Sequence, residues 1–161
     1  MGGDDILVVE NSATYWVAVN ALRRVRGHTV GAVGWGSGKT FPAQVSSLTV
    51  DIAGQGPLRG VVWYWGDYDP PGTKTAATAA RITNAVEVRP ATGLWAAVAG
   101  FSAKDVGTVS WVGAEGGDWL GGELWDRLAY VRTADGWIAQ ERVSANAVAA
   151  WAERISHGAS N

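Results

Sequence analysis

The chain contains no cysteine, and its 161 residues include only two histidines and one methionine. The absence of cysteine excludes disulfide bonds and metal sites built on thiolates. Neither sign of charge dominates, because 13 lysines and arginines stand against 15 aspartates and glutamates and give a net charge of -2. Such a chain lacks the broad positive field that drives unaided binding to a polyanion. Nucleic-acid binding would therefore need a metal ion, a few local cations or another polypeptide region.

The sequence also lacks an apolar run long enough to cross a membrane, and its acidic start does not resemble a secretory signal. We therefore expect no membrane association and a cytoplasmic location. No repeat, charge run or linker divides the chain, and 47% of it is hydrophobic. These features predict one domain over residues 1–161, in which residues 1–5 are candidates for disorder and residues 157–161 form a tail.

Short apolar segments alternate with helical patterns in the first half of the chain. The expected strands are residues 6–9, 29–33 and 61–65, and the expected helices are residues 12–26, 41–50 and 73–86. Such a series predicts an α/β fold, with a Rossmann-like and mostly parallel sheet flanked by helices. Further along, we expect a fourth strand at residues 107–112, a loop at 113–122, and helices at 122–132 and 144–155.

Carboxylates follow two of the expected strands. Asp67 and Asp69 come directly after the third strand, and Glu10 follows the first. Residues i and i+2 of extended backbone point the same way, and the carboxyl ends of parallel strands share one edge of the sheet. Three converging carboxylates suit a hard cation such as Mg²⁺, for which Mn²⁺ is expected to substitute. The simpler alternative is turn and capping chemistry, with Asp69 capping the next helix.

These motifs resemble the TOPRIM domain of topoisomerases, primases and several nucleases. The resemblance lies in Leu-Val-Val-Glu-Asn at residues 7–11, in Trp-Gly-Asp-Tyr-Asp-Pro-Pro-Gly at residues 65–72, and in Gln-Glu-Arg at residues 140–142. The Gly-Asp-x-Asp-x-x-Gly form is similar to that of type IIB topoisomerase A subunits. It is still more similar to that of JetD, the nuclease subunit of Wadjet anti-plasmid systems. The resemblance covers nearly the whole chain.

The resemblance implies a Mg²⁺-dependent phosphodiester chemistry on DNA. Asp67 and Asp69 would hold the metal, and Glu10 would be a further ligand or a general acid/base. Hydrolysis is favoured over topoisomerisation, because type IIB enzymes attack with a tyrosine on a separate winged-helix domain. The larger relatives also carry DNA-binding and partner-binding regions, so the chain resembles an excised catalytic domain or a minimal relative. The implied partners are DNA and either further domains or SMC-like complex subunits, with a homodimer as one arrangement.

Weaker candidates surround this acidic set. Ser37, Lys39 and Lys74 could contact DNA phosphates, and Asn11 and Glu141 could support the metal ligands. The glycine-rich loop at residues 34–40 resembles a phosphate-binding loop. However, a valine stands where the first glycine of that motif belongs, which argues against ATP binding.

Ten tryptophans suggest stacking on nucleobases, although most of them are expected in the core. Trp35 and Trp119 lie in glycine-rich loops and are the candidates for stacking. Two other functions stay open. A haloacid-dehalogenase-like phosphohydrolase also uses Asp-x-Asp with Mg²⁺, but on its opening strand. A non-catalytic TOPRIM module would only dock a partner.

Overall fold

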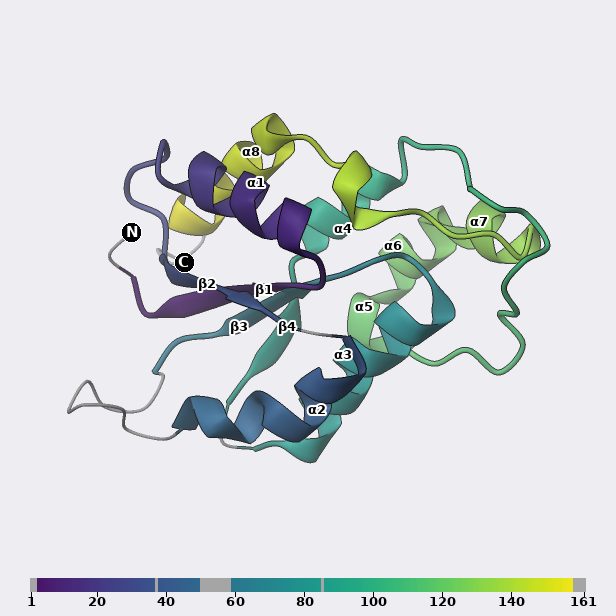
Figure 1. The fold of residues 1–161 in the computed structure, drawn as a ribbon, viewed down its shortest axis with the longest axis horizontal. Coiled ribbons are helices and arrows are strands. Elements are labelled where there is room, and N and C mark those ends of the chain that lie inside the picture. Colours follow the sequence, from purple (N-terminus) through teal and green to yellow (C-terminus); the bar gives the residue numbers. More distant parts are fainter. Residues whose placement is uncertain (1–2, 37, 50–58, 85, 158–161) are drawn as a thin grey trace.

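A single parallel sheet of four strands forms the centre of the molecule (Figure 1). The computed structural model describes residues 3–36, 38–49, 59–84 and 86–157. The strands are β1 (Asp5–Val9), β2 (Val30–Trp35), β3 (Val62–Trp65) and β4 (Val88–Pro90). Helices flank this sheet, so the predicted α/β class with about four parallel strands is confirmed.

The strand order β2-β1-β3-β4 places a topological switch point between β1 and β3. The chain runs outward from β1 to β2, and then returns to the other side of β1 to form β3. Val9 at the end of β1 is in register with both Trp35 and Trp65, so three strands end at the same level. Crevices outside such strand ends are where open α/β sheets bind ligands.

Helices cover both faces of the sheet (Figure 1). Helices α1 (Ser12–Leu22) and α8 (Ala145–His157) pack against each other on one face, whereas α2 (Phe41–Gln44) and α3 (Pro70–Ile82) lie on the other. The remaining helices are α4 (Thr92–Val98), α5 (Gly117–Leu120), α6 (Gly122–Arg127) and α7 (Ala129–Thr133). Three short 3-10 segments are η1 (Gly38–Thr40), η2 (Val45–Thr49) and η3 (Gln140–Arg142). Within the described ranges, no helix combines the length and hydrophobicity that a membrane crossing requires.

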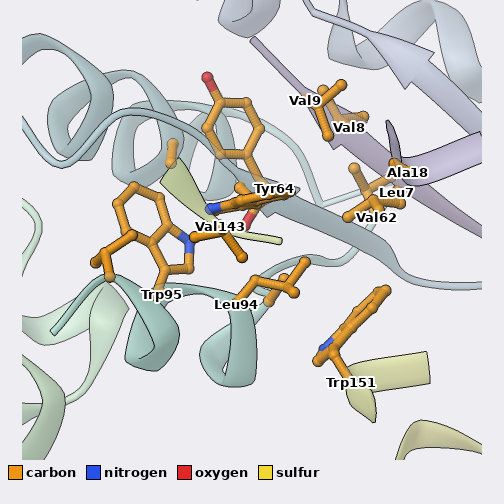
Figure 2. Packing of buried hydrophobic residues seen from close by; sticks show 14 of the residues in the cluster. Leu7, Val8, Val9, Ala18, Val62, Tyr64, Leu94, Trp95, Val143 and Trp151 are labelled. Carbon is orange, nitrogen blue, oxygen red and sulfur yellow. Dashed lines mark hydrogen bonds between the residues drawn. The ribbon is translucent and has the colours of Figure 1, made fainter. Parts of the chain in front are cut away.

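The core lies between the sheet and these helices (Figure 2). Leu7 and Val9 of β1 and Trp95 of α4 are fully buried there. Trp65 of β3 is fully buried in the same cluster. Burying one large apolar side chain contributes about 1.5–3 kcal/mol, so this cluster holds the strand ends in place.

Side-chain caps set the starts of the two helices that follow the carboxylates. Asn11 Oδ1 accepts a hydrogen bond from Thr14 N at 2.7 Å, which begins α1. Asp69 Oδ1 accepts one from Gly72 N at 2.6 Å, and prolines fill the first helical positions of α3. The predicted cap at Asp69 is confirmed, and Asn11 is the cap of α1. Helix α1 ends at Leu22, earlier than predicted.

The predicted fourth strand at residues 107–112 is wrong. This segment is a loop, in which Gly107 N and Val109 N bond to the turn at Ala134 and Asp135. Trp111 is buried because it packs on the rings of Tyr68 and of Trp125 in α6, and its alternation with Val109 therefore mimics a strand. The real fourth strand, β4, has only three residues and ends in proline, which suits the edge of a sheet.

The helix boundaries also differ from prediction. The helix expected at residues 122–132 breaks into α6 and α7 at Leu128, whose backbone leaves helical values at φ -95 and ψ 9. The loop expected at 113–122 contains the short helix α5. The helix expected at 41–50 is α2 followed by the 3-10 segment η2, and its last residue lies outside the described ranges.

Candidate active site

The switch point brings Glu10 beside the segment that carries the two aspartates. Glu10 Oε2 accepts a hydrogen bond from Asp67 N at 3.0 Å. Gly66 makes this approach possible, because a Cβ there would lie 2.6 Å from Glu10 Cδ. Any side chain at Gly66 would therefore displace Glu10. The Glu10 carboxylate, which follows β1, thus links the end of β1 to the segment that follows β3.

Tyr64 holds the other oxygen of Glu10. Its hydroxyl donates to Glu10 Oε1 at 2.5 Å, and its ring is fully buried beside Phe41 of α2. Sequence reasoning missed this residue. The available signal was alternation along β3, because Tyr64 lies two residues before Gly66 and therefore shares its face of the strand.

Gln140 connects the two strand ends from the far end of the chain. Its buried side chain donates from Nε2 to Trp65 O at 2.5 Å, and its Oε1 accepts from Glu10 N and Asn11 Nδ2, both at 3.3 Å. Its backbone N donates to Asp67 Oδ1 at 2.8 Å. Gln140 therefore fixes the end of β1, the start of α1 and the Asp67 carboxylate together.

The sequence predicts Glu141, together with Asn11, as a supporting residue, but its neighbour Gln140 makes the contacts to Glu10 and Asp67. Glu141 is exposed and makes no hydrogen bond or ion pair within the described part of the chain. Its charge still acts on Asp67, whose pKa it helps to raise. Asn11 does reach the site, but through Gln140 and while capping α1.

Tyr68 separates Asp67 from Asp69 and points into the protein. Its fully buried ring packs on Trp95, Trp111 and Trp125. Its backbone N and O form an antiparallel bridge with Ile138. This bridge places η3 and Gln140 directly behind the two aspartates.

All three carboxyl groups have raised pKa values. For Glu10, burial is the main cause, partly offset by the hydrogen bonds from Tyr64 and Asp67, and the charges of Asp67 and Asp69 add to the rise. Burial also dominates for Asp67, where the Gln140 N–H and the Lys104 charge oppose it. Burial raises the pKa of Asp69 to about 6, against the hydrogen bond from Gly72.

The charge of this acidic edge, defined as Glu10, Asp67 and Asp69, is not balanced by ion pairs. Among the described residues, every ion pair lies elsewhere. Asp67 Oδ2 and Asp69 Oδ2 accept no hydrogen bond within that part of the chain, so each aspartate keeps an oxygen for a ligand. Free carboxylate oxygens on two neighbouring aspartates, with a third carboxyl group beside them, suit a hard divalent cation.

Glu10 differs from the aspartates, because both of its oxygens are engaged. In the described ranges, no three acidic or histidine side chains converge closely enough to form a ready set of metal ligands. As the side chains stand, Asp67 and Asp69 have the available donor atoms. Glu10 lies beside them as a carboxyl group held by two hydrogen bonds.

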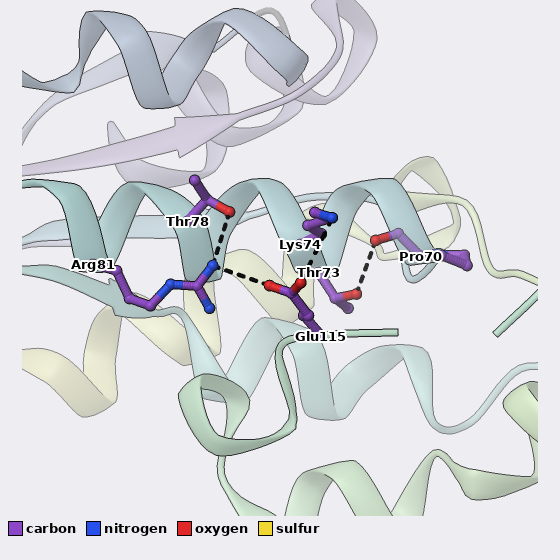
Figure 3. Close-up of polar contacts among 6 residues, drawn as sticks. All are labelled: Pro70, Thr73, Lys74, Thr78, Arg81 and Glu115. Carbon is purple, nitrogen blue, oxygen red and sulfur yellow. Dashed lines mark hydrogen bonds and ion pairs between the residues drawn. The ribbon is translucent and has the colours of Figure 1, made fainter. Parts of the chain in front are cut away.

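Of the three predicted phosphate contacts, only the side chain of Lys74 is described, and it is paired with a carboxylate outside the acidic edge. Lys74 Nζ lies 3.6 Å from Glu115 Oε1 on the solvent side of α3, and Arg81 Nη2 contacts the same carboxylate at 3.0 Å (Figure 3). Ser37 lies outside the described residues. Of Lys39, only the backbone is described, in the 3-10 segment that follows β2.

The two candidate stacking tryptophans have different environments. Trp119 is half-buried, donates from Nε1 to Val88 O at 3.2 Å and packs on Tyr64 and Trp95, so it belongs to the core. Trp35 is 63% exposed and donates from Nε1 to Glu10 O at 2.9 Å. Of these two described rings, Trp35 is the one that faces solvent beside Glu10.

Comparison with protein-family models, with curated proteins and with solved structures gave no match to this chain. The TOPRIM resemblance therefore rests on the short motifs alone.

Proposed function

We propose that the chain is the catalytic domain of a metal-dependent DNA endonuclease of TOPRIM type, acting in a Wadjet-like anti-plasmid system. The observation that carries this proposal is the acidic edge at the switch point of the sheet. Three half-buried carboxyl groups lie there with raised pKa values and with no ion-pair partner among the described residues. The choice of DNA as the substrate and of phosphodiester hydrolysis as the reaction rests on the TOPRIM-like motifs.

Asp67 and Asp69 are the proposed ligands of Mg²⁺ or Mn²⁺, through the oxygens that accept no hydrogen bond within the described chain. A divalent cation bound there would polarise the scissile phosphate and stabilise the leaving oxygen. Gln140 N orients Asp67, and Gly72 N orients Asp69. Both donors point the carboxylates without using all of their oxygens.

Glu10 is the proposed general acid/base. Burial and the neighbouring carboxylates raise its pKa, which moves it toward the range where a carboxyl group exchanges protons near neutral pH. Tyr64 and the Asp67 N–H hold its two oxygens in place. Direct coordination of the metal by Glu10 would require one of these hydrogen bonds to open, so the geometry favours proton transfer over ligation.

We expect most of the affinity for DNA to come from other polypeptide regions. The net charge of -2 gives little attraction for a polyanion. The exposed cations Lys74 and Arg81 are paired with Glu115. Further domains, SMC-like subunits or a second copy of the chain would complete the assembly, which we propose to be cytoplasmic.

The test compares three phosphate substrates, two diesters and one monoester, and three proteins. Purified chain with Mn²⁺ or Mg²⁺ is incubated with supercoiled plasmid and, separately, with bis(p-nitrophenyl) phosphate, a diester that needs no DNA grip. We expect hydrolysis of the diester, nicking of the plasmid, and loss of both with EDTA. Asp67→Asn keeps the acceptor for Gln140 N but halves the anionic ligands, and should lower the rate about 10³-fold or more.

Glu115→Gln is the matched control, because it also neutralises one carboxylate, but on the outer face of α3. Its rate should equal that of the unchanged protein. Hydrolysis of p-nitrophenyl phosphate without diester hydrolysis would instead indicate a monoester phosphohydrolase. Inactivity toward every substrate at high protein and Mn²⁺ concentration would indicate a non-catalytic docking module.

A further inference from the structure

Trp35 differs from the other tryptophans of the chain. Its side chain is 63% exposed, and within the described residues its ring contacts neither another aromatic ring nor a cation. Every other tryptophan is either fully buried or in such a contact. Trp16, the other highly exposed one at 60%, packs edge-on against Tyr15. An exposed indole face that no described aromatic ring or cation covers is available to a stacking partner.

The indole ring is fixed beside the acidic edge. Trp35 ends β2 in register with Val9, and Gly36 N donates to Val9 O at 2.9 Å. Trp35 Nε1 donates to the backbone oxygen of Glu10 at 2.9 Å. Strand β2 neighbours β1 at a spacing of about 4.8 Å, so the ring lies next to the backbone of Glu10, the residue that we assign to proton transfer.

The surroundings of the ring leave it accessible. The hydrogen bond uses the N–H at the ring edge and does not occupy the ring faces. Both chain neighbours, Gly34 and Gly36, lack side chains that could cover the ring. Strand β2 is also an outer strand of the sheet, so no further strand of this sheet lies beyond it.

We propose that Trp35 is a stacking platform for an unpaired nucleobase next to the phosphate held at the acidic edge. This inference rests on the proposed nuclease function and names its substrate class, DNA with a single-stranded or frayed nucleotide at the cleavage point. A base inside an intact duplex has both faces covered by its neighbours and cannot stack on the indole. Stacking also needs no positive charge, so it suits a chain with a net charge of -2.

The experiment measures stacking directly and needs no cleavage. Single-stranded oligonucleotides carrying 2-aminopurine, whose fluorescence falls when it stacks, are titrated with the chain in Ca²⁺ and in EDTA. A blunt duplex of the same sequence is titrated in parallel. We expect quenching with the single strand and little with the duplex. Trp35→Ala should remove the quenching and raise the dissociation constant about tenfold.

Two further variants separate stacking from other roles of the residue. Trp35→Phe keeps an aromatic face but loses the N–H, and should retain quenching with a dissociation constant within about threefold of the unchanged protein. Trp16→Ala removes an equally exposed tryptophan that contacts Tyr15 and should change nothing. Melting temperatures and far-UV circular dichroism confirm that each variant is folded.

Three results would overturn the platform. They are an absence of quenching by the unchanged protein, equal quenching by Trp35→Ala and Trp16→Ala, and equal loss in Trp35→Phe and Trp35→Ala. The last would show that the N–H only supports the Glu10 backbone. The nuclease proposal fails separately, if Asp67→Asn leaves diester hydrolysis unchanged while Trp35-dependent quenching persists.

Discussion

The carboxylate of Glu115 and the carboxylates of the acidic edge have pKa values that are shifted in opposite directions. Glu115 stands in solvent beside α3, where Lys74 and Arg81 pair with it and lower its pKa. The acidic edge is half-buried, is supported by hydrogen bonds instead of ion pairs, and has raised pKa values. The first arrangement is complete as it stands, whereas the second carries negative charge that lowers stability.

The comparison shows where a bound cation would have the larger effect on stability. Surface ion pairs such as those of Glu115 contribute little, since water screens them. The acidic edge keeps its charges together because Gln140 and Tyr64 hold them there. A site that retains unfavourable charge against the stability of the fold is a candidate functional site.

The largest expected effect concerns the residue that assembles the edge. Gln140→Ala removes a fully buried side chain and leaves Trp65 O and Glu10 N without their partner. We expect the free energy of unfolding to fall by about 2–4 kcal/mol, measured by urea denaturation. Glu141→Ala, at the exposed neighbouring position, should change it by less than about 0.5 kcal/mol. Equal effects of the two variants on the free energy of unfolding would show that Gln140 supports the acidic edge no more than an exposed residue does.

A smaller effect concerns pH. An acid whose pKa is higher in the folded than in the unfolded state binds more protons when folded, so stability falls as the pH rises between the two values. For Asp69 this window runs from 3.8 to about 6. Asp69→Asn keeps the cap of α3 and cannot ionise. In EDTA it should be about as stable as the unchanged protein at pH 4 and more stable by about 1 kcal/mol at pH 7.5, after allowance for screening.

Denaturation curves across this pH range provide the measurement. A constant difference between the two proteins from pH 4 to 7.5 would mean that Asp69 titrates as in the unfolded chain. The negative charge of Asp69 would then not lower the stability of the folded state.

The smallest effect is expected at Glu115. Its pKa is lowered, so its contribution to stability is present above the ordinary value of 4.5 and is lost as the pH falls through the folded pKa. The sign is thus opposite to that of Asp69. Glu115→Gln should leave the melting temperature at pH 7.5 within the error of calorimetry, because both partners are exposed. A clear loss of stability would show that this face is more than a solvated ion-pair cluster.

The sequence predicted correctly those elements whose residue patterns span only a few adjacent positions. The apolar strand β1, the Asn11 cap and the Asp69-Pro70-Pro71 helix start are each read from a few adjacent residues. The parallel topology then placed Glu10 near Asp67, because strand ends of a parallel sheet share an edge. The contact between them, Asp67 N to Glu10 Oε2, agrees with that placement.

Contacts between distant segments could not be predicted. Gln140 bonds to a residue 130 positions away, and no local pattern distinguishes it from the exposed Glu141. Strand β4 was missed because three residues ending in proline give no alternation. Trp111 imitated a strand residue because a loop, folded onto an aromatic cluster, buries it. In each case the structure depends on contacts with distant segments, which leave no periodic pattern in the local sequence.

The most direct test of the account is a titration of the chain with Mn²⁺, followed by the electron paramagnetic resonance signal of free Mn²⁺. We expect saturable Mn²⁺ binding that disappears in the Asp67→Asn, Asp69→Asn double variant and is unchanged in Glu115→Gln. Equal Mn²⁺ binding by the double variant and the unchanged chain would contradict it.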